Sequence, residues 1–279
     1  MITKPQKPRI SILGCGWYGF ALAKYLIANG YTVKGSTTSI AKLPVLSAEG
    51  ISAFQIDFKN APKNFDRDFF NCDVLLISIP PKSKDADANF EVQLKYIVEA
   101  VKNAGVKQVV LISSTGIYAD ENAVVNETVI PKPNTSSGKI LAAAEAVFQA
   151  EQLFTTTIIR FAGLIGEGRN LAKHFAGKKE IPNGLAPINL IHLDDCLGLT
   201  FAILEQEAFG TIYHGVTPDH PRRADFYTKL CAVTGLEEPA FLPELLQFKQ
   251  INSVNVPALL KYDFTIQNWN DWLKSGPKI

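Results

Sequence analysis

Short apolar segments alternate with segments of helical periodicity along the first two thirds of the chain. Residues 73–79, DVLLISI, have the length and the almost uninterrupted apolar character of a strand that is buried on both faces of a parallel sheet. Apolar residues in the segment 90–101 instead fall on one face of a helix, which Gly105 ends. Sustained alternation of this kind predicts an α/β fold with a doubly wound parallel sheet, which binds ligands outside the carboxyl ends of its strands.

The same pattern gives bounds for the elements and the domains. Strands are expected at residues 10–13, 31–35, 51–56, 73–79, 108–113 and 155–161, and helices at 40–49, 90–104 and 137–152. Pro44 is expected to interrupt the first of these helices near its start, and residues 118–133 read as a polar loop. We therefore expect a nucleotide-binding domain over residues 1–165, to which 188–215 return, and a smaller substrate-binding lobe formed by 166–187 and 216–279.

A glycine-rich turn follows the first strand directly. The sequence GCGWYG stands between an apolar run and a helical pattern, as in βαβ units that bind the pyrophosphate of a dinucleotide. The first glycine makes the tight turn, the second lets the backbone approach the phosphates, and the third lets the helix pack against the strand. The alternative is a tight turn that binds nothing. The predicted cofactor-binding residues of the motif are Gly14, Gly16, Trp17, Tyr18 and Gly19.

The end of the second strand indicates which dinucleotide is bound. NAD-binding units place a carboxylate there to bond the ribose hydroxyls, but this chain has no acidic residue between positions 14 and 49. Four hydroxyl residues at 36–39 and a nearby lysine favour a 2′-phosphate instead, and hence NADP over NAD. The alternative is that this segment only caps the next helix and that the site accepts both cofactors. The residues predicted to bind the phosphate are Ser36, Thr37, Thr38 and Lys42.

Composition and charge narrow the classes of partner. The chain has 279 residues, 47% of them apolar, and its 28 basic and 27 acidic residues leave a net charge of +1. This balance gives no electrostatic footprint for nucleic acid or an anionic membrane, so a small-molecule substrate is expected. No segment is apolar for long enough to span a membrane, residues 1–8 lack the apolar core of a signal peptide, and four widely spaced cysteines read as reduced thiols. A cytoplasmic protein is therefore expected.

From residue 112 onward the chain resembles one family. The segments that carry the resemblance are SSTGIY at 113–118, Asn126 with Glu127, a helix with Lys139 and Glu145, RFAGLIGEGR at 160–169, and IHLDD at 191–195. In this order they are similar to the extended short-chain dehydrogenase/reductases, the group of sugar-nucleotide epimerases and dehydratases, over most of residues 9–275. The closest resemblance is to the atypical, NAD(P)-dependent epimerase/dehydratase-like branch, whose members often lack the usual catalytic tyrosine. It implies a Rossmann-type fold.

The resemblance also implies a catalytic set of serine, tyrosine and lysine, in which the lysine ammonium lowers the pKa of the tyrosine. Ser114 matches the serine and Lys139 the lysine, but the tyrosine position holds Thr135, whose hydroxyl cannot transfer a proton in the same way. Thr135 can at most contact the substrate. Tyr118 could replace the missing phenol, or it could line the pocket or pack. Lys139 would bind the nicotinamide ribose, and Ser114 would polarise a substrate oxygen.

Further candidate residues follow strand ends. The family bonds the adenine amino group with an acidic residue at the place of Asp57, which could otherwise cap the next helix. His192 with Asp194 and Asp195 has the composition of a metal site, but its position between a strand and a helix favours an N-cap, and no metal is expected. The remaining residues expected at the cofactor are Ile79, Pro80, Ser113, Ala162 and Gly163.

The leading hypothesis is an NADP-dependent oxidoreductase or epimerase-like enzyme that acts on a small hydroxyl or carbonyl compound, with nucleotide sugars as one class of substrate. The missing phenol favours an alternative, a non-catalytic NADP-binding sensor or regulatory protein. The retained Lys139 favours the enzyme. A homodimer through the helices near 90–104 and 137–152 is the habit of the family.

Overall fold

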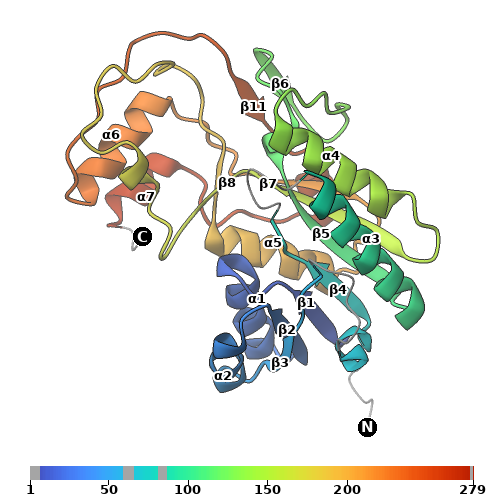
Figure 1. The fold of residues 1–279 in the computed structure, drawn as a ribbon. Coiled ribbons are helices and arrows are strands. Elements are labelled where there is room, and N and C mark those ends of the chain that lie inside the picture. Colours follow the sequence, from blue (N-terminus) through green and yellow to red (C-terminus); the bar gives the residue numbers. More distant parts are fainter. Residues whose placement is uncertain (1–6, 59–65, 81–86, 277–278) are drawn as a thin grey trace. The chain divides into compact units, whose positions relative to one another are not determined.

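Seven strands form one parallel sheet in the computed structural model, which describes residues 7–58, 66–80, 87–276 and 279 (Figure 1). The strand order is β10-β7-β5-β4-β1-β2-β3. Helices flank the sheet, so the predicted doubly wound α/β fold is confirmed. The strand bounds are β1 Ile10–Leu13, β2 Val33–Thr37, β3 Ser52–Gln55, β4 Val74–Ile77, β5 Gln108–Ser114, β7 Thr155–Phe161 and β10 Ile212–Gly215.

The strand order reverses its direction at β1. The chain runs outward from β1 through β2 to β3 and then returns to place β4 on the other side of β1. In the register, Ile12 lies beside Gly35 of β2, and Leu13 lies beside Ile77 of β4. A crevice at the carboxyl ends of the strands is expected where the order reverses. The glycine turn follows β1 directly and therefore stands at this point.

Helices α3 (Asp87–Ala104) and α4 (Ser136–Gln149) lie side by side on one face of the sheet, and α1 (Trp17–Ala28) and α2 (Leu43–Ala48) lie on the other (Figure 1). Every residue of β4 is buried, as predicted for a strand covered on both faces. Leu75 and Ile77 alternate with their neighbours and pack with Leu94 and Phe148 in one core beneath α3 and α4. This core fixes the positions of β4 and β5, the strands that lead to the predicted residues Ile79 and Ser114.

The chain divides into two compact units, which are described separately. The first comprises residues 1–113, 135–159 and 203–212, and the second comprises 114–134, 160–202 and 213–279. This division differs from the expected domain bounds, because residues 114–134, 160–165, 188–202 and 213–215 belong to the second unit. The remaining elements are β6 Ala123–Val125, β8 Gly163–Ile165, β9 Leu190–His192, α5 Leu193–Glu205, α6 Arg223–Val233, β11 Lys249–Ile251, α7 Trp269–Lys274, 3-10 helices at Ile40–Lys42, Arg67–Phe70, Thr115–Ile117 and Leu171–His174, and a π-helix at Val256–Leu260.

Two expectations about local structure were wrong. Pro44 does not interrupt a helix: a 3-10 turn precedes α2, and Pro44 lies in the first helical turn, where a missing N–H costs no bond. The expected polar loop at 118–133 contains β6, which pairs in parallel with β11. Three residues carry too little periodicity to announce a strand, and the partner strand lies more than 120 residues further along the chain.

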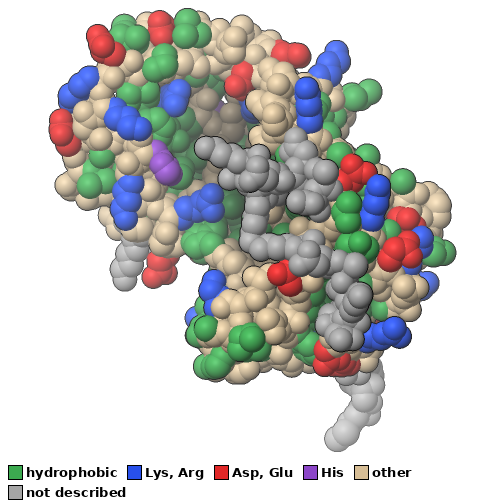
Figure 2. Space-filling view, viewed as in Figure 1, with side chains coloured by type: hydrophobic (Ala, Val, Ile, Leu, Met, Phe, Trp, Pro, Cys, Tyr) green, Lys and Arg blue, Asp and Glu red, His purple; other side chains and the backbone are tan. Residues whose placement is uncertain are grey.

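Acidic and basic side chains are interspersed on the face of the molecule shown in Figure 2, as the near-neutral net charge suggests. No helix in the described part of the chain is both long enough and apolar enough to cross a membrane.

Candidate dinucleotide site and the loop after β5

Two glycines of the turn are required by close packing. Gly14 has φ +102°, and a Cβ there would lie 2.6 Å from the carbonyl oxygen of Ser78, just after β4. A Cβ on Gly19 would lie 2.3 Å from the carbonyl oxygen of Gly14. The first glycine therefore lets the ends of β1 and β4 meet, and the last lets α1 sit directly on the turn.

Gly16 is different, because the space beside it is open. A Cβ at this position would meet no atom of the described residues within 4 Å, and its backbone conformation (φ −81°, ψ −156°) is one that any residue can adopt. Gly16 is the N-cap of α1, and the first turn of α1 holds no acidic residue. A twelve-residue helix thus begins beside open space with its positive end uncompensated by a carboxylate. The open space and the helix start suit a phosphate group.

The two residues after Gly16 and the cysteine before it differ in burial. The Trp17 side chain is half-buried, whereas Tyr18 lies in the core at 5% exposure, so the part of Tyr18 that remains for a cofactor is its backbone. Cys15 is also buried, and desolvation raises the pKa of its thiol to about 12. This cysteine therefore stays protonated and packs as a small apolar residue.

Ser36 holds the turn in place. Its hydroxyl accepts a hydrogen bond from the Gly14 N–H at 3.0 Å, and its carbonyl accepts one from the Cys15 N–H at 2.8 Å. Ser36 and Thr37 belong to β2, which runs two residues further than expected, and both are buried. The expected loop of four hydroxyls is therefore shorter. Thr38 and Lys42 are exposed beyond the strand end.

The other predicted cofactor-binding residues of the first unit lie at strand ends. Ile79 follows β4, and its Cγ1 would be 3.4 Å from a Cβ on Gly14, so it lies against the glycine turn. Pro80 is the next residue and is exposed. Asp57 is exposed two residues beyond β3. Ser113 instead donates its hydroxyl hydrogen to Oε1 of buried Glu145 at 2.5 Å, which ties β5 to α4.

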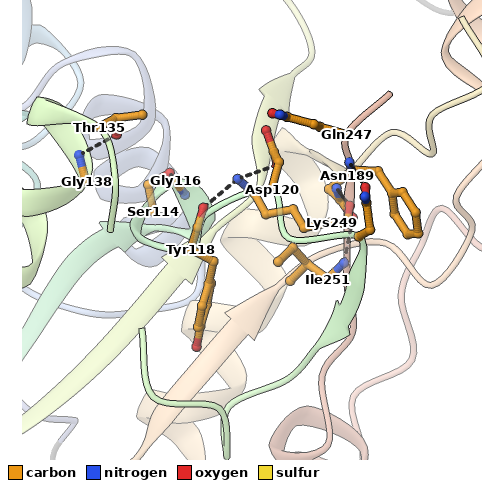
Figure 3. Close-up of polar contacts among 12 residues, drawn as sticks. Ser114, Gly116, Tyr118, Asp120, Thr135, Gly138, Asn189, Gln247, Lys249 and Ile251 are labelled. Atoms are coloured by element: carbon orange, nitrogen blue, oxygen red, sulfur yellow. Dashed lines mark hydrogen bonds and ion pairs between the residues drawn. The ribbon is translucent and has the colours of Figure 1, made fainter. Parts of the chain in front are cut away.

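Thr135 is the N-cap of α4. Its hydroxyl oxygen accepts a hydrogen bond from the Gly138 N–H at 3.1 Å (Figure 3). The hydroxyl that stands where the family has a phenol therefore satisfies the helix start. Lys139 lies in the first turn of α4, and its side chain is exposed. No acidic residue shares that turn, so the helix dipole opposes the lysine charge at this position.

Ser114 begins the second unit at the end of β5. Its hydroxyl oxygen accepts a hydrogen bond from the Gly116 N–H at 3.1 Å, which caps a single 3-10 turn (Figure 3). The side chain is half-buried. An accepted bond leaves the hydroxyl hydrogen for donation, so Ser114 can still polarise an oxygen.

The phenol of Tyr118 points away from Ser114 (Figure 3) and belongs to a buried polar network. Its hydroxyl lies 3.0 Å from Nε2 of His214 and accepts a hydrogen bond from Nη1 of Arg160. Nδ1 of His214 lies 2.9 Å from the carbonyl oxygen of Asn252, which can only accept a hydrogen bond, so Nδ1 carries a hydrogen. The Tyr118 hydroxyl also lies 3.5 Å from the carbonyl oxygen of Asn126. All three side chains are at most 4% exposed. This geometry favours the packing alternative over the proton donor.

The comparisons with known proteins agree with this geometry. The sequence profile of NAD(P)H-binding proteins matches residues 14–186. The chain belongs to this NAD(P)H-binding family. It is 31% identical over 237 residues to protein YeeZ of Escherichia coli, which covers 84% of this chain and 86% of YeeZ.

Two further similar proteins are more distant in sequence. The 3-diazoavenalumate denitrifying reductase of a Streptomyces species is 28% identical over 188 residues, covering 62% of this chain and 61% of the reductase. The structure of UDP-glucuronic acid 4-epimerase from Bacillus cereus in complex with NAD superposes with a TM-score of 0.78 at 20% identity, covering 96% and 95% of the two chains. This epimerase and other such neighbours share the fold of this chain.

Two predictions remain for this NAD(P)H-binding protein: Ala162 and Gly163 as cofactor-binding residues, and an aspartate of the 192–195 cluster as a helix N-cap. The N–H groups of Ala162 and Gly163 donate to Gly215 and Asn189, so they serve the strands. Neither aspartate is an N-cap, because α5 already begins at Leu193. Asp194 pairs with His192 at 3.3 Å, a hydrogen bond that lowers the pKa of its carboxyl.

Asp195 is fully buried and binds the C-terminal segment. It accepts hydrogen bonds from the Tyr262 hydroxyl and from the N–H groups of Thr265 and Ile266, while burial raises the pKa of its carboxyl. Within the described residues, no group of three or more His, Cys, Asp or Glu side chains could hold a metal ion.

Sequence reasoning missed the residues that fix the loop after β5. Glu127 accepts hydrogen bonds from the N–H groups of His214 and Val254, both at 2.8 Å, and from the Ser253 hydroxyl. Lys249 donates to the Tyr118 carbonyl oxygen. In the sequence, Asn126-Glu127 is marked only by the family resemblance, and Lys249 stands in a segment without a motif.

Proposed function

We propose that this protein is an NADP-preferring oxidoreductase of the extended short-chain type that acts by hydride transfer on a small carbonyl or hydroxyl compound, with nucleotide sugars as one substrate class. The observation that carries the proposal is the start of α1, where Gly16 leaves open space beside an uncompensated helix end. NADP(H), when bound, accepts or supplies the hydride. The named reductase and epimerase relatives support this class of reaction.

The chain's own residues have separable roles in this proposal. The start of α1 binds the pyrophosphate, and exposed Thr38 and Lys42 bind the 2′-phosphate at the end of β2. Lys139 donates hydrogen bonds to the nicotinamide ribose. Ser114 donates its hydroxyl hydrogen to the substrate oxygen. Because the Tyr118 hydroxyl is buried against His214 and Arg160, an ordered water supplies the proton.

The cofactor preference is tested by calorimetry. NADP is expected to bind at least about tenfold more tightly than NAD, or roughly 1.4 kcal/mol. Lys42→Glu should weaken NADP binding and spare NAD, because a carboxylate repels the 2′-phosphate. Lys95→Glu is the matched control: it makes the same charge change at an exposed position of α3. Equal affinity for the two cofactors would refute the preference.

The chemistry is tested by a screen of carbonyl compounds for NADPH consumption. On any compound that is reduced, Lys139→Ala should lower turnover at least about tenfold, on the order of 1.4 kcal/mol, with little change in melting temperature. Lys107→Ala, which alters an exposed lysine just before β5, should have no effect. Full activity of Lys139→Ala would show that the family's mechanism does not operate here.

One observation favours a second candidate, an NADP-binding sensor. The Thr135 hydroxyl caps α4 and the Tyr118 phenol is buried, so neither of these side chains acts as an acid. A sensor would bind NADP in the titration and leave every compound in the screen unreduced. Reduction of any compound at a rate that depends on Lys139 decides for the enzyme.

A further inference from the structure

The loop after β5, residues 118–127, is bound by a segment from near the C-terminal end of the chain. We call residues 247–254, which include β11, the strap. Beta strands β6 and β11 pair in parallel, with Gln250 opposite Val124. Before the pair, Asn122 and Phe248 exchange two hydrogen bonds, at 2.8 and 3.0 Å. The strap therefore follows the loop along its length.

The strap is itself held by Asn189. The side-chain amide of Asn189 donates to the Lys249 carbonyl oxygen at 2.8 Å and accepts from the Ile251 N–H at 2.7 Å (Figure 3). One amide side chain thus pairs with the backbone of β11 on both sides of Gln250. At the far end of the strap, Glu127 accepts from the Val254 N–H and the Ser253 hydroxyl.

Lys249 connects the strap to the turn that begins at Ser114. Its ammonium donates to the Tyr118 carbonyl oxygen at 2.7 Å and pairs with Asp120 at 3.0 Å, and its side chain is 19% exposed (Figure 3). Tyr118 ends the 3-10 turn that the Ser114 hydroxyl caps at its start. The turn is therefore held at one end by Ser114 itself and at the other by a charge-assisted bond from the strap.

We propose that Lys249 is a positioning residue, which fixes the Ser114 hydroxyl through the Tyr118 carbonyl and so controls substrate affinity and not cofactor affinity. The proposal rests on the role of Ser114 in the proposed function. Lys249→Met removes the donor and the charge at similar side-chain length, and Lys249→Arg keeps both. Lys229→Met is the control, because this lysine of α6 lies in the same unit and donates to the side-chain oxygen of Asn270, away from the loop and the strap.

Two measurements test it. By hydrogen exchange, the Gly116 and Tyr118 amides should open about tenfold faster in Lys249→Met and at the wild-type rate in Lys229→Met. With a substrate from the NADPH screen, KM should rise at least about fivefold in Lys249→Met, with kcat and the NADPH Kd within about twofold, and Lys249→Arg should restore KM. A purely structural role would lower the melting temperature without raising KM, and that result would overturn the proposal.

The exchange measurement separates this inference from the proposed function. If no compound in the screen is reduced, the proposed function fails, while unchanged exchange in Lys249→Met overturns the role of the strap independently. Should Lys249→Met not fold, Asp120→Asn removes the ion pair from its half-exposed side. That variant should speed exchange of the same amides about two- to threefold, and exchange at the wild-type rate would count against the proposal.

Discussion

The glycine turn and the loop after β5 both follow a strand of the same sheet, but they are held in different ways. The partners of the turn are nearer in sequence: the Gly14 N–H bonds Ser36, 22 positions away, and Gly14 packs against Ser78, 64 positions away. The loop is held by the strap, with Lys249 bonded to Tyr118 across 131 positions and Val254 bonded to Glu127 across 127. Contacts between residues that are near in the sequence can be predicted from a local motif, whereas contacts across more than 120 positions cannot.

This difference changes what a substitution reports. At the turn, Gly14 and Gly19 are each required by one close contact and Gly16 has open space beside it, so a side chain added at any of them tests one property directly. The loop is bound by several hydrogen bonds, from β10 and from the strap. The loss of one bond by a single substitution is therefore partly compensated by the others. The comparison therefore predicts sharp, separable effects at the turn.

The largest expected effect is on cofactor binding, in Gly16→Val. The valine side chain would occupy the open space where the pyrophosphate is expected, so NADP affinity should fall at least about 100-fold, or about 2.8 kcal/mol. The free energy of unfolding should change by less than about 1 kcal/mol, because the backbone conformation of Gly16 suits any residue. Fluorescence titration and urea unfolding measure the two quantities. Unchanged affinity would remove the site from this turn.

A smaller effect, on stability, is expected for Gly19→Ala. Its Cβ would stand 2.3 Å from the Gly14 carbonyl oxygen, a backbone atom that cannot swing aside. Overpacking should lower the free energy of unfolding by about 2 kcal/mol, even though alanine's helix propensity returns roughly 1 kcal/mol. Gly16→Ala is the matched control, since its Cβ enters open space. Equal stability of the two variants in urea would break the distinction between the packing glycine and the binding glycine.

The sequence predicts the features that depend on periodicity and on glycine. The strand β7 was expected at its observed bounds, and β4 was expected as a strand buried on both faces. The glycine turn was found because strand, turn and helix are contiguous in the chain. The end of β2 was misplaced by two residues, because Ser36 and Thr37 have the composition of a loop. They belong to the strand because they pair with β3 and because the Ser36 hydroxyl accepts a hydrogen bond from the Gly14 N–H.

Features that depend on pairing between distant segments could not be predicted from the sequence. Strand β6 exists because β11 lies beside it, and Asp195 is buried because Tyr262, Thr265 and Ile266 supply three donors from a distant segment. Neither partner can be found from local composition. The same limit applied to Tyr118, whose phenol could be assigned to the network only once Arg160 and His214 were in place.

The smallest expected effect concerns Thr135. This residue is either a helix cap, which is a local structural feature as the glycine turn is, or a residue that contacts the substrate. A test of Thr135 therefore sharpens the comparison. As an N-cap it bonds the Gly138 N–H, and Thr135→Ala should lower the free energy of unfolding by about 1 kcal/mol. Thr135→Ser keeps the oxygen and should match wild type to within about 0.5 kcal/mol. If the residue is a cap alone, both variants retain NADPH affinity and turnover to within about twofold, because α4 is still held by the buried Ser113–Glu145 bond. A tenfold loss of turnover in Thr135→Ala that Thr135→Ser restores, at unchanged stability, would instead place this hydroxyl on the substrate.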